Sequence, residues 1–269
     1  MPQFAIELPS TKLRLSVGSQ TDVGSMRRVN EDSLVDTPPV FLVADGMGGH
    51  ARGDAASQTV ARVFASEFSA NEPTTVEAVT SALSLANDEV RTQSENAEEG
   101  PALSGTTVTG VALVETGGKD DSARGVGGSH EWMIFNIGDS RVYEWNDDNL
   151  TQITVDHSAV QELVEAGVIS PHEAEVHPDR NVITRAIGAA EWVRPDVWLV
   201  PLGAARTFVI CSDGLTKELD DDSIGVIMRG ADERGEADRV ADLLVEAALD
   251  AGGRDNVTVV VIRAANATL

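Results

Sequence analysis

The chain has 269 residues, 42% of them hydrophobic, which is enough for one large domain or two small ones with a substantial core. Acidic residues outnumber basic residues by 44 to 20. The formal net charge of -24 argues against nucleic-acid binding, because that affinity comes from lysine and arginine displacing the counterions of phosphates. The acidity also has a plain alternative explanation, namely solubility or a salt-rich or acidic proteome background.

The N-terminus and the apolar runs favour a cytoplasmic protein. The first ten residues contain two prolines and no basic region, so no secretory signal is expected. The longest apolar run, residues 257–262, has the length of a strand and not of a membrane span. Cys211 is the only cysteine, which excludes an internal disulfide and suits a reducing compartment. We therefore expect a cytoplasmic protein with no membrane span.

The first third of the chain predicts strands followed by two helices. Residues 13–18 alternate apolar and polar side chains as a strand does, and residues 33–36 and 40–45 are expected to form a hairpin through two prolines. Residues 56–68 show helical spacing. A second helix should begin at a capping box of Thr74 and Glu77, and its apolar face contains Val76, Val79, Leu83, Ala86 and Val90.

The middle of the chain predicts antiparallel strands and then an irregular stretch. Residues 104–114, 132–137, 141–145 and 150–155 have strand patterns, most of them joined by short connections. Residues 156–194 contain a short helix ending near Gly167 and a capping box of Ser170 and Glu173 with Pro171 at the first helical position. This stretch is typical of a recognition flap, and a disordered surface excursion is the alternative.

The last third returns to strands and helices. Strands are expected at residues 197–202, 207–212 and 257–262, and helices at residues 222–229 and 240–248, the second closed by Gly252 and Gly253. No linker divides the chain. We predict one domain over residues 1–269, with a flap at 156–194, built of mostly antiparallel strands covered by two pairs of helices.

Acidic residues stand at the ends of four apolar runs. Asp45, Asp139 and Asp213 follow such runs directly or after one or two residues, and Asp255 precedes the last one. An Asp-Gly pair taken alone is typical of a plain turn. Four carboxylates that converge repel one another unless a cation neutralises them, so together they favour divalent metal ions with oxygen ligands.

A charged loop precedes the first of these acids. Arg27 and Arg28 come first and Glu31 and Asp32 follow, with little apolar content between them. Such a loop is usually only solvated. Because the positive residues come first and the negative residues follow, the loop would nevertheless suit an anion bound beside a cation.

Seven short motifs in chain order resemble the metal-dependent Ser/Thr protein phosphatases of the PP2C or PPM family. The motifs are Arg27-x3-Glu31-Asp32, Asp45-Gly46-Met47-Gly48-Gly49-His50, Ser104-Gly105-Thr106-Thr107, Gly138-Asp139-Ser140-Arg141, Asp156-His157-Ser158, Ser212-Asp213-Gly214 and Arg254-Asp255-Asn256. The match extends over most of the chain. The sequence DGMGGH and the run at residues 177–188 resemble the bacterial branch, whose members oppose eukaryotic-type Ser/Thr kinases.

The resemblance implies an α+β fold, a four-layer αββα sandwich of two mainly antiparallel sheets flanked by pairs of helices. It implies a binuclear Mn²⁺ or Mg²⁺ centre at one end. By position, the ligands would be Glu31, Asp45, the carbonyl of Gly46, Asp213 and Asp255. Asp139 and Asp213 would hold a third, weaker ion, and Asp32 and Asn256 would hold metal waters and ligands in place.

The chemistry implied is hydrolysis of phosphoserine and phosphothreonine monoesters by a metal-activated water. Arg27 is the candidate phosphate clamp because a guanidinium matches two phosphate oxygens, and Arg28 is its competitor. Eukaryotic members have a histidine where this chain has Met47, so the general acid stays open between a metal-bound water and His50. The alternative for His50 is a structural role in the glycine turn.

Other readings of the chain remain as alternatives. Cysteine-dependent phosphatases need an arginine where this chain has Lys217, so Cys211 is expected to be a buried, inert thiol, and His157 to organise the start of the flap. A non-catalytic phosphoprotein-binding module would share the fold, and a phosphodiesterase would share the two metals. The expected partners are phosphorylated proteins, including a eukaryotic-type kinase and its substrates, and the chain is expected to be a monomer.

Overall fold

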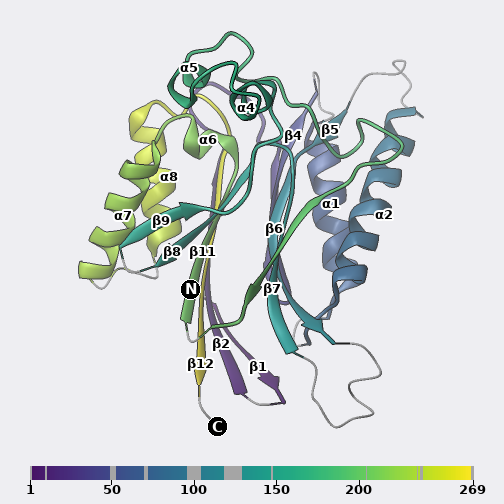
Figure 1. Ribbon diagram of the computed structural model, residues 1–269, viewed down its shortest axis with the longest axis vertical. Coiled ribbons are helices and arrows are strands. Elements are labelled where there is room, and N and C mark those ends of the chain that lie inside the picture. Colours follow the sequence, from purple (N-terminus) through teal and green to yellow (C-terminus); the bar gives the residue numbers. More distant parts are fainter. Residues whose placement is uncertain are drawn as a thin grey trace.

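The computed structural model describes residues 2–9, 11–48, 53–69, 72–95, 104–117, 129–146, 148–203, 205–234, 236 and 239–267. Two antiparallel sheets face each other at its centre (Figure 1). The first sheet has the order β1 (Gln3–Leu8), β2 (Thr11–Asp22), β12 (Val257–Ala267), β11 (Ala205–Cys211), β8 (Arg141–Asn146) and β9 (Asn149–Gln152). The second has the order β10 (Asp196–Pro201), β7 (Ser129–Ile137), β6 (Val108–Thr116), β4 (Val40–Met47) and β3 (Asp32–Thr37), with the short β5 (Gly105–Thr106) paired to β4.

Helices cover the outer face of each sheet. The helices α1 (Gly53–Glu67) and α2 (Val76–Glu95) pack on the second sheet, and α7 (Asp221–Arg234) and α8 (Val240–Ala251) pack on the first (Figure 1). The short helices α4 (Ala159–Glu165), α5 (Pro171–Glu175) and α6 (Asp213–Thr216) lie together at one end. The predicted α+β fold, a four-layer αββα sandwich, is confirmed.

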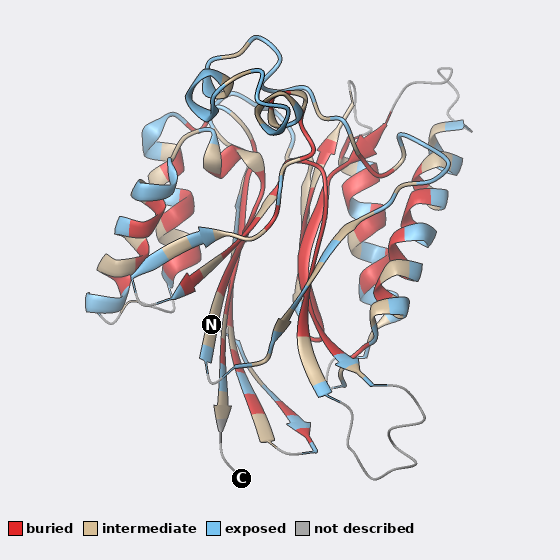
Figure 2. Ribbon diagram, in the orientation of Figure 1, coloured by how far each residue is buried: buried red, intermediate tan, exposed pale blue. Residues whose placement is uncertain are grey.

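Three apolar layers hold the sandwich together, and Figure 2 shows the buried residues concentrated in the facing strands. Strand β4 contributes to two of these layers, because successive side chains of a strand point to opposite faces. Phe41 packs between the sheets, whereas Leu42 packs under α1 and α2. Trp132 and Phe208 join the two sheets with their rings edge to face at 5.6 Å. A strand buried on both faces explains the continuous apolar run at residues 40–44.

The antiparallel register brings the strand ends that carry acidic residues to one end of the molecule. In the β3–β4 hairpin, Asp32 lies opposite Asp45. In the first sheet, Cys211 at the end of β11 lies opposite Val259, near the start of β12. The segments that follow β4 and β11 and those that precede β3 and β12 therefore meet at the same end of the sandwich.

One strand was not predicted, and one predicted helix cap was wrong. Residues 3–8 form β1, for which no element was expected. The cap of α2 is Thr75, whose Oγ1 accepts from the N–H of Ala78 at 3.1 Å. Thr74 instead exchanges backbone hydrogen bonds with Leu113 and Glu115, so strand-like pairing overrode the expected capping box. The box of Ser170 and Glu173 at the start of α5 is confirmed.

None of the helices described is long and apolar enough to cross a membrane. The flap at residues 156–194 contains α4 and α5 and pairs with the second sheet through a bridge between Thr106 and Ile187. The assignment of the whole chain to one domain stays a prediction.

Phe135 offers a test of the packing between the second sheet and its helices. The ring is fully buried and stacks on Phe64 of α1 at 5.9 Å. Phe135→Ala is expected to lower the free energy of unfolding by about 3 to 5 kcal/mol, because it removes the burial and leaves a cavity. Urea titration followed by circular dichroism measures this. Val226→Ala on α7, where the side chain is 62% exposed, is the control and should change little.

Candidate metal centre

The backbone of Asp45, near the end of β4, is held by the hydroxyls of two threonines, one of which contacts a serine hydroxyl. The Asp45 N–H donates to Oγ1 of Thr107 at 3.0 Å, and its carbonyl accepts from the hydroxyl of Thr106 at 2.9 Å and the N–H of Thr107 at 2.9 Å. The hydroxyls of Thr107 and Ser140 lie 2.8 Å apart. The motifs at residues 104–107 and 138–141 therefore fix the backbone of the most central carboxylate.

Close backbone packing joins Glu31 to the turn after Asp45. The N–H of Gly46 donates to the carbonyl of Glu31 at 3.1 Å. A Cβ at Gly46 would lie 2.2 Å from the carbonyl oxygen of Gly53 and 2.5 Å from that of Glu31, so only glycine fits this position. The side chain of Glu31 lies beside Gly53 at the start of α1. Glu31 and the carbonyl of Gly46 are thus brought together.

Asn256 ties the loop that carries Arg27 and Glu31 to the start of β12. Its amide donates to the carbonyls of Val23 and Val29 at 2.9 and 3.0 Å, and its Oδ1 accepts from the N–H of Glu31 at 2.9 Å. Its own N–H donates to Oδ1 of Asp255 at 2.9 Å. Asn256 therefore positions two predicted ligands that are far apart in the sequence, Glu31 through its side chain and Asp255 through its backbone N–H.

Asp32 is fixed by two hydroxyl groups from the first sheet. Its Oδ2 accepts from Ser212 at 2.8 Å and from Thr258 at 2.6 Å. Ser212 precedes Asp213, and Thr258 follows Asp255 and Asn256, so Asp32 of the second sheet holds both strand ends of the first sheet in place. The hydrogen bonds of Asp32 therefore link the two sheets.

Two cationic side chains lie on Asp213 and Asp255. The ammonium of Lys217 is 2.5 Å from Oδ2 of Asp213 and 3.0 Å from Oδ2 of Asp255. The guanidinium of Arg27 reaches both oxygens of Asp255, with Nε 2.9 Å from Oδ1 and a terminal nitrogen donating to Oδ2 at 3.0 Å. Arg28 is exposed. Arg27 therefore lies at the carboxylate cluster, where the sequence analysis placed the phosphate clamp.

The pKa values show that the carboxylates repel one another. Burial raises the pKa of Asp45 well above its usual value, and the charges of Asp32, Asp213 and Asp139 raise it further. Burial raises the pKa of Asp139 to about 7, assisted by Asp213, and that of Asp32 to about 7 despite its two hydroxyl donors.

The two cations reverse this trend at the edge of the cluster. Burial alone would raise the pKa of Asp255, but Lys217 and Arg27 more than offset it, and the pKa of this carboxyl lies below its usual value. Burial raises the pKa of Glu31, and Arg27 opposes that effect. The carboxyl groups that are not paired directly with Lys217 or Arg27, namely Asp32, Asp45 and Asp139, are therefore the most costly to ionise.

The residues present fit divalent metal ions. Buried oxygens of Asp32, Asp139 and Asp213 have no hydrogen-bond partner among the described residues. Hard cations prefer such carboxylate oxygens, and their charge offsets the repulsion within the cluster. In the described part of the chain, no three acidic, histidine or cysteine side chains already surround one point as an ion cage. The ammonium of Lys217 lies between Asp213 and Asp255, within 3.0 Å of an oxygen of each.

Three further side chains discussed in the sequence analysis lie as follows. His50 falls outside the described residues. Cys211 is fully buried in β11, and burial raises its thiol pKa to about 12, which makes it a poor nucleophile. His157 accepts from the N–H of Gly138 through Nδ1 at 3.0 Å, and its Nε2 is 3.2 Å from Asp196. His157 therefore joins the start of the flap to the loop that carries Asp139.

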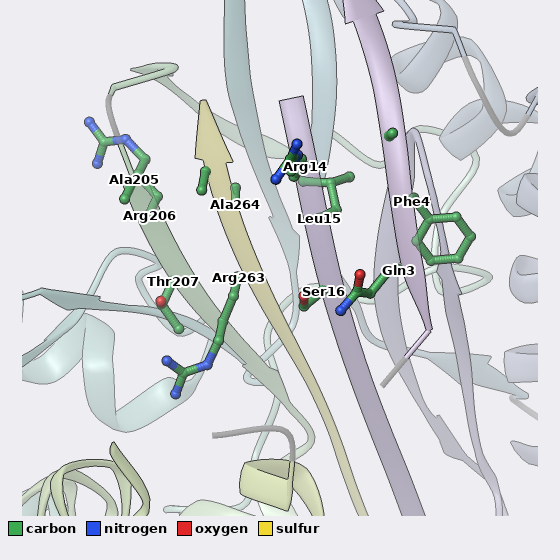
Figure 3. A pocket seen from close by; sticks show the side chains of 12 residues that line it. Gln3, Phe4, Arg14, Leu15, Ser16, Ala205, Arg206, Thr207, Arg263 and Ala264 are labelled. Atoms are coloured by element: carbon green, nitrogen blue, oxygen red, sulfur yellow. The ribbon is translucent and has the colours of Figure 1, made fainter. Parts of the chain in front are cut away.

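A shallow groove of about 710 Å³ lies away from the carboxylates, over β1, β2, β12 and β11 (Figure 3). Arg14, Arg206 and Arg263 lie along it. Arg206 pairs with Glu144, and Arg263 pairs with Asp232 at 2.7 Å. The groove holds no carboxylate among its lining residues and no predicted site residue, so it is distinct from the carboxylate cluster.

The fold and the acid-lined end define the class of the protein. A sandwich whose strand ends gather carboxylates around a guanidinium has the ligands for divalent ions and a partner for a phosphate, which is the arrangement of a metal-dependent phosphatase. Residues 27–245 match the protein phosphatase 2C family, and the chain belongs to this family.

Characterised relatives and solved structures extend this similarity over most of the chain. The serine/threonine phosphatase stp of Listeria welshimeri is 33% identical over 250 residues, which cover 90% of this chain and 93% of that protein. The serine/threonine protein phosphatase PstP of Mycobacterium tuberculosis is 36% identical over 93% of this chain and 45% of that longer protein. The crystal structure of the PstP catalytic domain in complex with two manganese ions has a TM-score of 0.79 and 33% identity, covering 94% of this chain and 99% of that chain.

Sequence reasoning missed several residues of the site. Lys217 was considered only as a mismatch to another class of phosphatase, although it stands four residues after Asp213, a spacing that places two side chains on one face of a helix. Ser212 and Thr258 gave no separate signal, because their role depends on the contact between the two sheets.

The raised pKa values predict how the protein responds to pH when divalent ions are removed with EDTA. Asp32 and Asp139 titrate near 7 when folded and near 3.8 when unfolded, so between these values the folded state binds more protons. Stability should therefore fall as the pH rises from about 5 to about 7.5. Thermal unfolding at a series of pH values measures this.

Asp139→Asn is the matched variant for that measurement. It removes one of the carboxyl groups whose pKa is raised, so the slope of melting temperature against pH should flatten and the melting temperature near neutral pH should rise by a few degrees, as expected for about 1 kcal/mol. Burial lowers the pKa of His157, which contributes the opposite slope in both proteins and cancels in the comparison. An unchanged slope in the variant would contradict the assignment.

Proposed function

We propose that this chain is a metal-dependent protein phosphatase that hydrolyses phosphoserine and phosphothreonine monoesters. The observation that carries the proposal is the set of buried carboxylates at one end of the sandwich, three of them with unpartnered oxygens, beside the guanidinium of Arg27. The Ser/Thr phosphatase relatives support the substrate class. A non-catalytic phosphoprotein-binding module on the same fold is less well supported, because the chain keeps the full set of acidic residues.

The carboxylates would hold two divalent ions, which supply an activated water and neutralise charge on the phosphoryl oxygens. Asp45 would contribute to both ions from its braced strand end. Asp213 and Asp255 would complete one site, and Glu31 with the carbonyl of Gly46 the other. The residues are positioned in advance by backbone contacts, so binding requires movement of side chains and little movement of loops.

Arg27 would leave Asp255 to bind the phosphate. Its side chain is 49% exposed, and it already reaches across two oxygens of one carboxylate, the geometry in which a guanidinium binds two phosphate oxygens. Divalent ions at Asp255 would weaken its pairing with Arg27, because both interact with the same oxygens.

The finer features of the function are also part of the proposal. The ions are Mn²⁺ or Mg²⁺, and Asp139 with Asp213 would hold a third, weaker one. Asp139 is 9% exposed and has an unpartnered oxygen, which supports a cation there. We further propose a cytoplasmic monomer that acts on phosphorylated proteins, among them a eukaryotic-type Ser/Thr kinase and its substrates, with the flap at residues 156–194 beside the site.

The proposal predicts phosphate release that depends on divalent ions. A phosphothreonine peptide should be hydrolysed with Mn²⁺ and not with EDTA, as measured by release of inorganic phosphate. Asp45→Asn and Asp213→Asn should each lower kcat/KM by about 100-fold or more, since each removes charge from an ion site. Turnover unaffected by EDTA or by both substitutions would reject the proposal. Binding of the peptide without hydrolysis at saturating Mn²⁺ would favour the non-catalytic module, and faster turnover of a bis-aryl phosphate than of a monoester would favour a phosphodiesterase.

The role of Arg27 is tested by comparing its alanine variant with that of Arg28. Arg27→Ala should raise KM for the phosphopeptide by about tenfold or more, because a hydrogen-bonded charge pair with the phosphate is lost. Arg28→Ala makes the same change one residue along, at an exposed side chain, and should alter KM by less than about twofold. Steady-state kinetics at fixed Mn²⁺ measures both. Equal effects of the two variants would count against Arg27 as the clamp.

A further inference from the structure

Lys217 is the side chain in the centre to which neither the family motifs nor the mechanism assigns a role. It follows α6 directly, and its N–H donates to the carbonyl of Asp213 at 2.8 Å. Its ammonium bridges Asp213 and Asp255 at 2.5 and 3.0 Å. The lysine side chain is 35% exposed, and the two carboxylates are 13% and 17% exposed, so the bridge is largely shielded from water.

The backbone of Lys217 is fixed relative to Asp255. The next residue, Glu218, is half-buried and accepts from the N–H and Nε of Arg254 at 2.9 Å each and from its terminal nitrogen at 3.0 Å. Arg254 is the residue before Asp255. The ion pair of Glu218 and Arg254 therefore holds the segment after α6 against the segment before β12.

The ammonium and a divalent ion need the same oxygens. A Mg²⁺ ion bonds carboxylate oxygens at roughly 2.1 Å, and an ammonium between the same two oxygens would be repelled by it. The charge of Lys217 also reaches Asp45 and Asp139, whose carboxylates it stabilises. Its exposed fraction gives the side chain a path to solvent once an ion takes its position.

We propose that Lys217 is an internal counter-ion, which neutralises Asp213 and Asp255 until a divalent ion displaces it and which thereby sets the metal affinity of this position. The proposal rests on the metal-dependent function proposed above. Arg27 does not serve the same purpose, because its side chain is half-exposed and, among the described residues, it pairs with Asp255 and not with Asp213.

Lys217→Gln tests the proposal by removing the charge while keeping a polar side chain of similar length. In EDTA, the melting temperature should fall, because two carboxylates lose their counter-charge. The dissociation constant for Mn²⁺, measured by isothermal titration calorimetry, should fall by about tenfold, and the rise in melting temperature on adding Mn²⁺ should increase. Lys217→Arg, which keeps the charge, should behave nearly as the wild type.

Lys12→Gln is the matched control. Lys12 pairs with Glu7 at 2.5 Å on the β1–β2 hairpin, and neither residue belongs to the predicted metal site, so the substitution makes the same change in net charge away from the ions. It should leave both the Mn²⁺ dissociation constant and the Mn²⁺-induced shift unchanged. A merely structural role of Lys217 would lower the melting temperature equally with and without Mn²⁺, and that result, or an unchanged dissociation constant, would overturn the proposal.

A measurement on the wild type keeps the proposal testable if Lys217→Gln does not fold. The ¹⁵N resonance of the Lys217 ammonium, assigned by its loss in Lys217→Arg, should shift when Mg²⁺ is added. A resonance that stays unchanged at saturating Mg²⁺ would overturn displacement. If neither Mn²⁺ nor Mg²⁺ binds the wild type, the proposed function itself fails, which is distinct from binding that is insensitive to Lys217.

Discussion

Repulsion between carboxylates is the constraint on which this end of the molecule depends. Burial and neighbouring charges raise the pKa values of Asp32, Asp45 and Asp139, so each of these groups is costly to ionise where it stands. Hydrogen-bond donors and cations relieve that cost, and Lys217 and Arg27 place positive charge beside Asp213 and Asp255. A protein gains little stability from such a cluster, which argues that the acids are gathered for binding and catalysis.

The sandwich brings these acids together because every named strand pair is antiparallel. In an antiparallel pair, the end of one strand lies beside the start of its neighbour. The segments that precede β3 and β12 and those that follow β4 and β11 therefore reach the same end of the two sheets. Contacts across the sheets complete the arrangement, since Asp32 of the second sheet accepts from Ser212 and Thr258 of the first. The apolar layer between the sheets thus fixes the distance between carboxylates that are far apart in the sequence.

The elements and the acids were predictable from the sequence to different degrees. Asp45 and Asp213 stood out because each ends an apolar run with Asp-Gly, a local pattern. The cap of α2 was misjudged by one residue because Thr74 pairs with Leu113, a contact that local sequence does not reveal. Lys217 was missed for a related reason, since its ammonium lies between two carboxylates of which only Asp213 is near in sequence.

At this site, hydrogen bonds to the backbone fix the positions of the acidic residues, and long side chains supply the neutralising charges. Hydroxyls of Thr106 and Thr107 fix the main chain of Asp45, and the amide of Asn256 fixes that of Glu31, so the ligand positions are set before any ion arrives. The charges that neutralise Asp213 and Asp255 are carried instead by two long side chains, Lys217 and Arg27. A divalent ion at these carboxylates would displace side chains and leave the strand ends in place, which is the preorganisation that metal-assisted hydrolysis needs.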